Sequence, residues 1–168
     1  MKTLYPQALI AVVSAGLAIL PAMVSADTAT GSLGVKIEIT SNCAVSTSNT
    51  ALDFGSHAST ETSASADNGA FTVSCTNETP YDIGLVPVST ASTTGSGEMK
   101  DGSGTNSIAY QLYSDAAMSA VWGSDTGNMQ SSTGTGSAQD YTVYGKVMGS
   151  MNVPAGSYND TVTINVTY

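Results

Sequence analysis

Residues 29 to 39 alternate between small or apolar side chains and polar ones, with a period of two. Polar residues such as Lys36 and Glu38 lie at the intervening positions, and the apolar positions are Ala29, Gly31, Leu33, Val35, Ile37 and Ile39. This period puts the apolar side chains on one face of an extended strand. Because an unpaired strand edge invites aggregation, the pattern predicts that the segment pairs with a sheet.

The same alternation recurs in five later segments, which are residues 71–75, 81–85, 108–112, 141–147 and 162–168. Clusters of Gly, Ser, Thr, Asn and Asp separate these segments, and apolar residues at helical spacing are hard to find after Ala26. A strand with one apolar face needs a second layer to cover it. The sequence therefore predicts an all-β protein, most simply a β-sandwich.

The first 26 residues have the features of a secretory signal peptide. Lys2 precedes an apolar run from Ala8 to Leu20, and small residues at Val24-Ser25-Ala26 favour cleavage before Asp27. The apolar run is too short for a comfortable membrane span. We expect an exported, soluble product with no membrane-spanning segment.

About 140 residues follow the predicted signal peptide, which is enough for one domain and leaves little room for two. The chain has 13 acidic residues against 4 basic ones, and its formal net charge is −9. The lysines of the mature part, Lys36, Lys100 and Lys146, are scattered. Nucleic acid is excluded as a partner, because its phosphates require clustered Lys and Arg.

The chain has two cysteines, Cys43 and Cys75. An even number of cysteines in an exported chain favours one intramolecular disulfide. A loop of this length predicts a stabilisation of about 3 to 4 kcal/mol on the chain-entropy account. A redox role is not expected, because no Cys-x-x-Cys spacing is present.

Two segments rich in Ser, Thr, Gly and Asp, Ser89 to Gly104 and Ser124 to Ala138, are predicted to be flexible surface loops. The sequence ends differently, with a strand pattern from Thr161 to Tyr168 and no polar tail after it. We expect such a strand either to be captured by a partner or to be a plain terminal strand.

Catalytic motifs are not recognisable in this sequence. A histidine-based metal site or a Ser-His-Asp triad would depend on His57 alone, within a serine-rich stretch. The run Asp101 to Asn106 resembles a calcium loop only weakly, because alternating carboxylates are missing. We therefore expect no enzyme activity, no cofactor and no metal.

A series of short motifs carries a family resemblance over nearly all of Gly31 to Tyr168. The chain resembles the spore coat protein U domain family and, more closely, the rod subunits of Csu-type archaic chaperone-usher pili. The motifs are Cys43-Ala-Val45, Leu52-Asp-Phe-Gly55, Phe71-Thr-Val-Ser-Cys75, Tyr81-Asp-Ile-Gly-Leu85, Ile108-Ala-Tyr-Gln-Leu-Tyr113, Trp122-Gly123, Tyr141-Thr-Val-Tyr-Gly145 and Ala155-Gly-Ser-Tyr-Asn-Asp-Thr-Val162.

This resemblance implies an incomplete immunoglobulin-like sandwich, a six-stranded pilin domain at residues 41–168 that lacks its last strand. Residues 27–40 would be an N-terminal donor strand that fills the groove of a neighbouring copy. A periplasmic chaperone would hold the groove first and anchor the C-terminus near Val166 and Tyr168. The further implied partners are other copies in a head-to-tail filament, an outer-membrane usher, and tip and minor pilins. The implied location is a cell-surface pilus used for adhesion and biofilm formation.

Two questions stay open at the level of sequence. The register of the donor strand is not fixed, because Ile39 could belong to the first strand of the domain that leads to Cys43. The second hypothesis for function is a secreted monomeric coat or ligand-binding β-sandwich, whose N-terminal strand joins its own sheet.

Overall fold

The structure is a computed structural model that describes residues 25–47 and 51–168. The predicted signal peptide lies outside the described residues apart from Ser25 and Ala26. The chain divides into two units, residues 1–37 and 38–168. The described part of the first unit has no regular secondary structure. In the described residues, no helix is long and apolar enough to cross a membrane.

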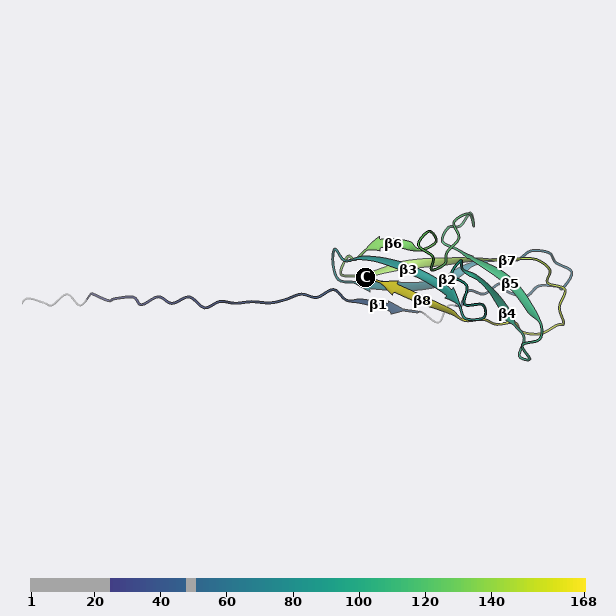
Figure 1. Cartoon of the computed structure of the whole chain (residues 1–168), viewed down its shortest axis with the longest axis horizontal. Coiled ribbons are helices and arrows are strands. Elements are labelled where there is room, and N and C mark those ends of the chain that lie inside the picture. The colour runs from purple at the N-terminus through teal and green to yellow at the C-terminus, as the bar shows by residue number, and fades with distance from the viewer. Residues whose placement is uncertain (1–24, 48–50) are drawn as a thin grey trace, which may run out of the picture. The chain divides into compact units, whose positions relative to one another are not determined.

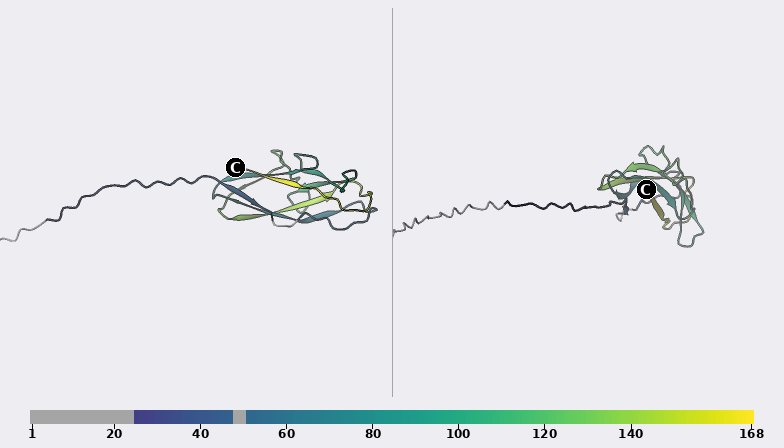
Figure 2. Two further views of the ribbon diagram at one scale, coloured as in Figure 1. Left: turned by 90° about the horizontal axis from the view of Figure 1, so that it is seen from below. Right: turned by 60° about the vertical axis from the view of Figure 1, so that its left-hand side comes forward.

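The second unit contains eight strands, which are labelled in Figure 1. They are β1 (Cys43–Ser46), β2 (Ser65–Cys75), β3 (Pro80–Pro87), β4 (Ser96–Lys100), β5 (Ser107–Tyr113), β6 (Gln130–Thr133), β7 (Ala138–Val147) and β8 (Val162–Thr167). They form a five-stranded sheet in the order β1-β2-β7-β5-β4 and a three-stranded sheet in the order β6-β3-β8. Every pairing is antiparallel. Figure 2 shows the strands from two further directions. The predicted all-β sandwich is confirmed.

The core lies between the two sheets and consists of the alternating apolar residues of the predicted strands. Val73, Ile83 and Leu112 have no exposed surface. Trp122 is 1% exposed, and its indole Nε1–H donates a hydrogen bond of 3.0 Å to the carbonyl oxygen of Ile83. This bond satisfies the one polar atom of a large side chain that is otherwise used for packing.

The disulfide between Cys43 and Cys75 is present. The two residues are directly opposite each other in the β1–β2 pair, so the bond ties the start of β1 to the end of β2. This confirms the predicted pairing and fixes the edge strand of the larger sheet.

Both segments predicted to be flexible loops contain a strand, so this prediction is wrong. β4 lies within Ser89–Gly104 and pairs with β5, and its Met99 packs against the core. β6 lies within Ser124–Ala138 and pairs with the first half of β3. Neither strand shows apolar alternation, because each lies at a sheet edge and gains its order from backbone pairing with a stronger neighbour. Because β4 and β6 are present, the domain has eight strands, whereas the resemblance implies six.

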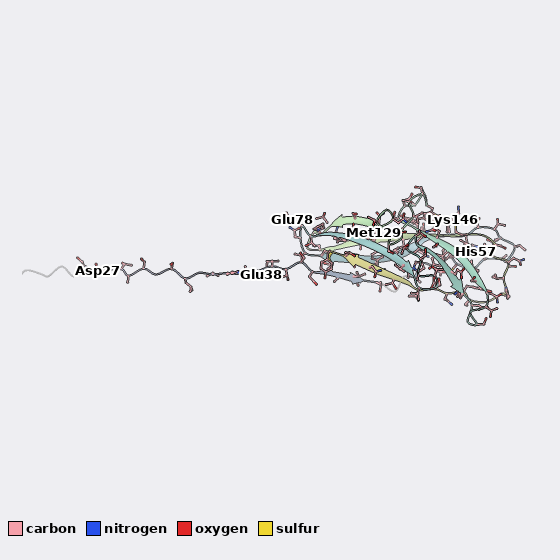
Figure 3. The ribbon with its side chains drawn as sticks, in the orientation of Figure 1. Asp27, Glu38, His57, Glu78, Met129 and Lys146 are labelled. Carbon is pink, nitrogen blue, oxygen red and sulfur yellow. A yellow bond between two sulfur atoms is a disulfide. The ribbon has the colours of Figure 1, made fainter. Side chains whose placement is uncertain are left out.

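The short connection Thr76–Thr79 joins β2 to β3 at one end of the sandwich. Glu78, labelled in Figure 3, adopts a positive φ of 61° there, and Thr79 N–H donates to Thr76 O at 3.1 Å. The turn joins the end of β2, which pairs with the start of β1, to the start of β3. Since β3 begins beside the end of β8, β1 starts and β8 ends at the same end of the domain. The two strands therefore run in opposite directions, as Figure 1 shows.

Candidate functional site

The apolar face predicted for residues 29–39 is uncovered. Leu33, Val35, Ile37 and Ile39 are 89%, 91%, 82% and 73% exposed, and Ala29 and Gly31 are exposed as well. Large aliphatic side chains at alternate positions, all in solvent, are unusual for a stable chain. This segment therefore has the properties of a strand that lacks its sheet.

β8 has one paired edge and one edge that no described strand covers. It pairs with β3, and its side chains alternate between half-buried and exposed. The half-buried residues are Val162, Ile164 and Val166, which pack against the core of the sandwich. The free edge of β8 therefore borders apolar side chains that the domain only partly covers.

The backbone groups of the same three residues face the free edge. Thr161 O accepts a hydrogen bond of 2.8 Å from Val88 N, so the backbone N–H and C=O groups of Thr161 point toward β3. Successive residues of a strand direct their groups to opposite sides. Val162, Ile164 and Val166 consequently present their N–H and C=O groups to the open side, next to their apolar side chains.

β1 is the edge strand of the other sheet, and it has the same arrangement. Asn42 O accepts a hydrogen bond of 2.9 Å from Thr76 N, which directs Asn42 toward β2. By alternation, Cys43 and Val45 direct their backbone groups to the free side, and the side chain of Val45 is 41% exposed. Two open edges of opposite direction thus border the same apolar interior.

A cavity of about 350 Å³ lies beneath this opening, near the start of β8. Both sheets line it, together with the segment that follows β1. Its apolar lining includes Leu52, Phe54, Leu85, Tyr110, Val162 and Ile164. A cavity of this size lined by hydrophobic side chains indicates that the sandwich is incompletely filled.

The segment at residues 51–55 forms one wall of the cavity and is held by polar contacts. The Asn68 side chain accepts a hydrogen bond of 2.9 Å from Asp53 N and donates one of 3.1 Å to Asp53 O. Asn68 lies where the β2–β7 register shifts, between Ala66 and Gly69, so the irregularity frees this side chain to reach the segment. Gly145 leaves room for the wall, since a Cβ there would lie 2.7 Å from Leu52 Cδ2.

A carboxylate, that of Asp160, lies in the lining of the cavity just before β8. Asp160 is half-buried and accepts hydrogen bonds from Ser89 N at 3.1 Å, Ser89 Oγ at 2.5 Å and Tyr110 OH at 2.8 Å. Burial first, and then the hydrogen bond to Asp160, raise the pKa of Tyr110 above its usual range. The phenol therefore stays protonated, and it donates to a carboxylate whose oxygens are satisfied within the domain.

The run Asp101 to Asn106, which the sequence compares with a calcium loop, is held together by its own hydrogen bonds. The Asp101 carboxylate accepts hydrogen bonds from Ser103, Thr105 and Asn106 of its own loop, which hold its pKa down at about 2. These donors occupy the oxygens that a cation would need. In residues 25–47 and 51–168, no group of three His, Cys, Asp or Glu side chains is arranged to hold a metal.

At the C-terminal end of β8, Val166 is half-buried and Tyr168 is 57% exposed. These are the residues that the resemblance assigns to chaperone anchoring, a role that stays a prediction. Sequence reasoning missed Asp160, Asn68 and the cavity wall. Ser89 and Asp160 are 71 residues apart, and no local pattern marks such a pair.

Taken together, the fold and the open groove define an immunoglobulin-like β-sandwich that is incomplete along one side. The family model described as Spore Coat Protein U domain matches residues 29–165. The chain therefore belongs to the spore coat protein U domain family.

The known proteins similar to this chain include the following two. Protein U of Myxococcus xanthus is 36% identical over 70 residues, which are 42% of this chain and 39% of Protein U. A chain in the crystal structure of the CsuC–CsuE chaperone-tip adhesion subunit pre-assembly complex, from the archaic chaperone-usher Csu pili of Acinetobacter baumannii, aligns with a TM-score of 0.54. That alignment has 22% identity and covers 77% of this chain and 40% of the other. The matches thus span less than half of either relative, and the likeness to the solved structure concerns the fold.

Proposed function

We propose that this protein is a structural subunit of chaperone-usher pili, which polymerises by donating its N-terminal strand to the groove of another copy. One observation carries the proposal: the same chain has an exposed segment in which apolar and polar residues alternate, and a sandwich with an open edge and an unfilled interior. Family membership and the fold shared with a chain of the Csu pre-assembly complex support it.

The open edge suits an added strand. Val162, Ile164 and Val166 offer three N–H and three C=O groups beside apolar side chains, so a docked strand gains hydrogen bonds and burial together. Each large aliphatic side chain that enters the groove contributes about 1.5 to 3 kcal/mol. The face formed by Leu33, Val35, Ile37 and Ile39 matches this groove in character and spacing.

The direction of the docked strand follows from the two edges. Because β1 and β8 run in opposite directions, a strand between them is antiparallel to one and parallel to the other. Antiparallel pairing is the more stable arrangement, and β8 has six residues against four in β1, so we take the docked strand to be antiparallel to the longer edge, β8. The body of the donating copy then continues beyond the start of β8. In the accepting copy, β1 begins at the opposite end of the domain. Donor and groove are different surfaces, so the contact does not close on itself and predicts an open filament.

The remaining parts of the proposal concern partners and location. A periplasmic chaperone would cover the groove before assembly, near Val166 and Tyr168, and an outer-membrane usher would export the subunits to a cell-surface pilus. The chain has both a donor and a groove, as a repeated rod subunit requires. We therefore propose a major subunit, with tip and minor pilins as neighbours, in fibres that support adhesion and biofilm formation.

The experiment compares two single substitutions in the extension. Val35→Asp places a charge on the apolar face, and Ser32→Asp places the same charge on the polar face. Because an unpaired charge is costly to bury, Val35→Asp is expected to abolish fibres in electron micrographs and heat-sensitive ladders in unboiled gels. Ser32→Asp is expected to keep both.

Normal fibres from the Val35→Asp variant would contradict the proposal. A wild-type protein that remains a stable monomer without any chaperone, even when it is concentrated, would instead support the secreted monomeric sandwich.

A further inference from the structure

The junction between the extension and the domain determines whether a copy can fill its own groove. Ile39, Thr40, Ser41 and Asn42 connect the exposed apolar face to β1. In the fold, the last two of these residues are attached to the Thr76–Thr79 turn. This inference rests on the proposed function. It concerns whether the extension can reach the groove of its own domain or only the groove of another copy.

Two sets of contacts anchor the junction. Asn42 N donates a hydrogen bond of 3.0 Å to Thr76 Oγ1, and Asn42 O accepts one of 2.9 Å from Thr76 N. The hydroxyl of Thr79, a residue that is 7% exposed, donates to Ser41 Oγ at 3.5 Å. Ser41 and Asn42 therefore continue the line of β1, and the chain is free to turn only before Ser41.

The favoured antiparallel direction is out of reach within one copy. In that direction Leu33 lies beside the end of β8, and Ile39 lies about 20 Å away, beside its start. The chain would then have to return to Asn42, at the end of the domain where β1 begins. Only three Cα–Cα steps separate Ile39 from Asn42, and they span at most about 11 Å.

The opposite direction requires a hairpin between the extension and β1. Residues opposite each other in a hairpin share one face, and Cys43, which packs against the core, marks the inner face of β1. A two-residue turn at Ile39-Thr40 places Lys36 opposite Cys43. The charged face of the extension would then point into the apolar groove, which is strongly unfavourable.

A three-residue turn directs the apolar face of the extension into the groove, but it requires an unfavourable backbone conformation. With a turn at residues 38–40, Ile37 lies opposite Ser41, and Thr40 must take the left-handed conformation. Thr40 is β-branched, and such residues rarely adopt a positive φ. Among described non-glycine residues, only Glu78, Ala91 and Met118 have one. Three-residue turns at residues 39–41 and 40–42 also keep the correct face, but the first uses the anchored Ser41 and the second uses both Ser41 and Asn42. Longer turns either use these residues too or withdraw Ile37 from the groove.

We propose that Ile39–Asn42 is a directional lock, which denies the extension access to the groove of its own domain and reserves it for a second copy. The anchor on Thr76 and Thr79 fixes the line of the chain, and Thr40 disfavours the one three-residue turn that keeps the correct face and leaves both anchored residues in place. Trans donation is then built into the junction and does not depend on a chaperone.

The test measures uptake of a labelled synthetic peptide of residues 27–42. The disulfide-bonded mature chain is refolded by dilution into excess peptide, at a concentration where light scattering shows monomers. The Val35→Asp/Ile37→Asp double variant, whose own extension cannot enter the groove, gives the uptake of an open groove. Wild type is expected to take up as much peptide as this double variant.

Thr40→Gly removes the obstacle to the three-residue turn and leaves Leu33, Val35, Ile37 and both anchors in place. It is expected to raise the self-closed fraction about 5- to 30-fold, with a corresponding loss of peptide uptake. Thr40→Ala keeps a Cβ atom, so it is the matched control and is expected to behave like wild type.

Two results would overturn the lock and leave the proposed function intact. In the first, monomeric wild type takes up much less peptide than the double variant. In the second, Thr40→Gly takes up as much peptide as wild type. Absence of uptake by the double variant would show that the groove does not accept this strand, and would overturn both proposals.

Discussion

At the residue scale, His57 is held between two hydrogen-bond acceptors. Nδ1 lies 2.8 Å from Glu61 Oε2, and Nε2 lies 2.7 Å from the carbonyl oxygen of Phe54, whose side chain lines the cavity. Only the protonated ring donates to both. The Glu61 hydrogen bond first, and then the Phe54 carbonyl, raise the pKa of His57 above 6.5.

His57 is the only histidine of the chain, so its proton NMR signal can be followed through a pH titration. We expect a midpoint above 6.5, which Glu61→Gln lowers and Glu78→Gln leaves unchanged. Any stabilisation from this pair is fully present between pH 4.5 and pH 6.5. It is lost as the pH rises through the raised pKa of His57 and as the pH falls through the lowered pKa of Glu61. A wild-type midpoint at the ordinary value would contradict this account.

Two glycines offer a second test at this scale. Gly95 has a φ of +76°, and a Cβ there would lie 1.9 Å from Trp122 O. Gly102 has nothing within 4 Å of such an atom. We expect Gly95→Ala to lower the free energy of unfolding by more than about 2 kcal/mol, while Gly102→Ala changes it by less than about 0.5 kcal/mol. Urea denaturation of the two variants checks this, and equal midpoints would argue against the packing around Trp122.

At the element scale, the sequence predicts strands well where one face is buried and poorly at sheet edges. Phe71, Val73 and Cys75 alternate because every second side chain enters the core. β6 is composed of Gln, Ser and Thr, and its order comes from pairing with β3. Such pairing between distant segments leaves no periodic signal, which is why β4 and β6 were predicted as loops.

The same limit applies to the candidate site. The alternating apolar face of residues 29–39 could be predicted because its residues are neighbours in sequence, and its role as a donor stays a prediction. Asp160, Ser89 and Tyr110 come from segments far apart in sequence, before β8, after β3 and within β5, and Asn68 reaches Asp53 through a register shift in β2. A local pattern cannot reveal side chains that tertiary structure brings together.

The edge strand β1 gives a prediction at this scale. It pairs only with β2, and the disulfide from Cys43 closes a sequence separation of 32 residues. Replacing both cysteines with serine is expected to lower the free energy of unfolding by about 3 to 4 kcal/mol. Denaturation of the double variant, compared with the oxidised wild type, measures this loss. An unchanged midpoint would show that β1 does not depend on the bond.

At the scale of the whole molecule, the exposed extension and the open groove are each unfavourable for an isolated chain, and on the proposed function they complement each other between copies. The donor is fixed at one end of the chain, and the groove lies between β1 and β8. A contact between unlike surfaces repeats without closing, so a single subunit type suffices to build a filament of any length. The lock at Ile39–Asn42 directs the same surfaces toward assembly and away from self-closure.

The most direct test of this account is a cryo-electron microscopy reconstruction of fibres formed by the wild-type chain. We predict strand density between β1 and β8 of each subunit, antiparallel to β8, continuous with the body of a neighbouring copy, and with Leu33, Val35, Ile37 and Ile39 directed into the groove. An empty edge on β8, or density that traces back to the same copy, would contradict donor-strand polymerisation.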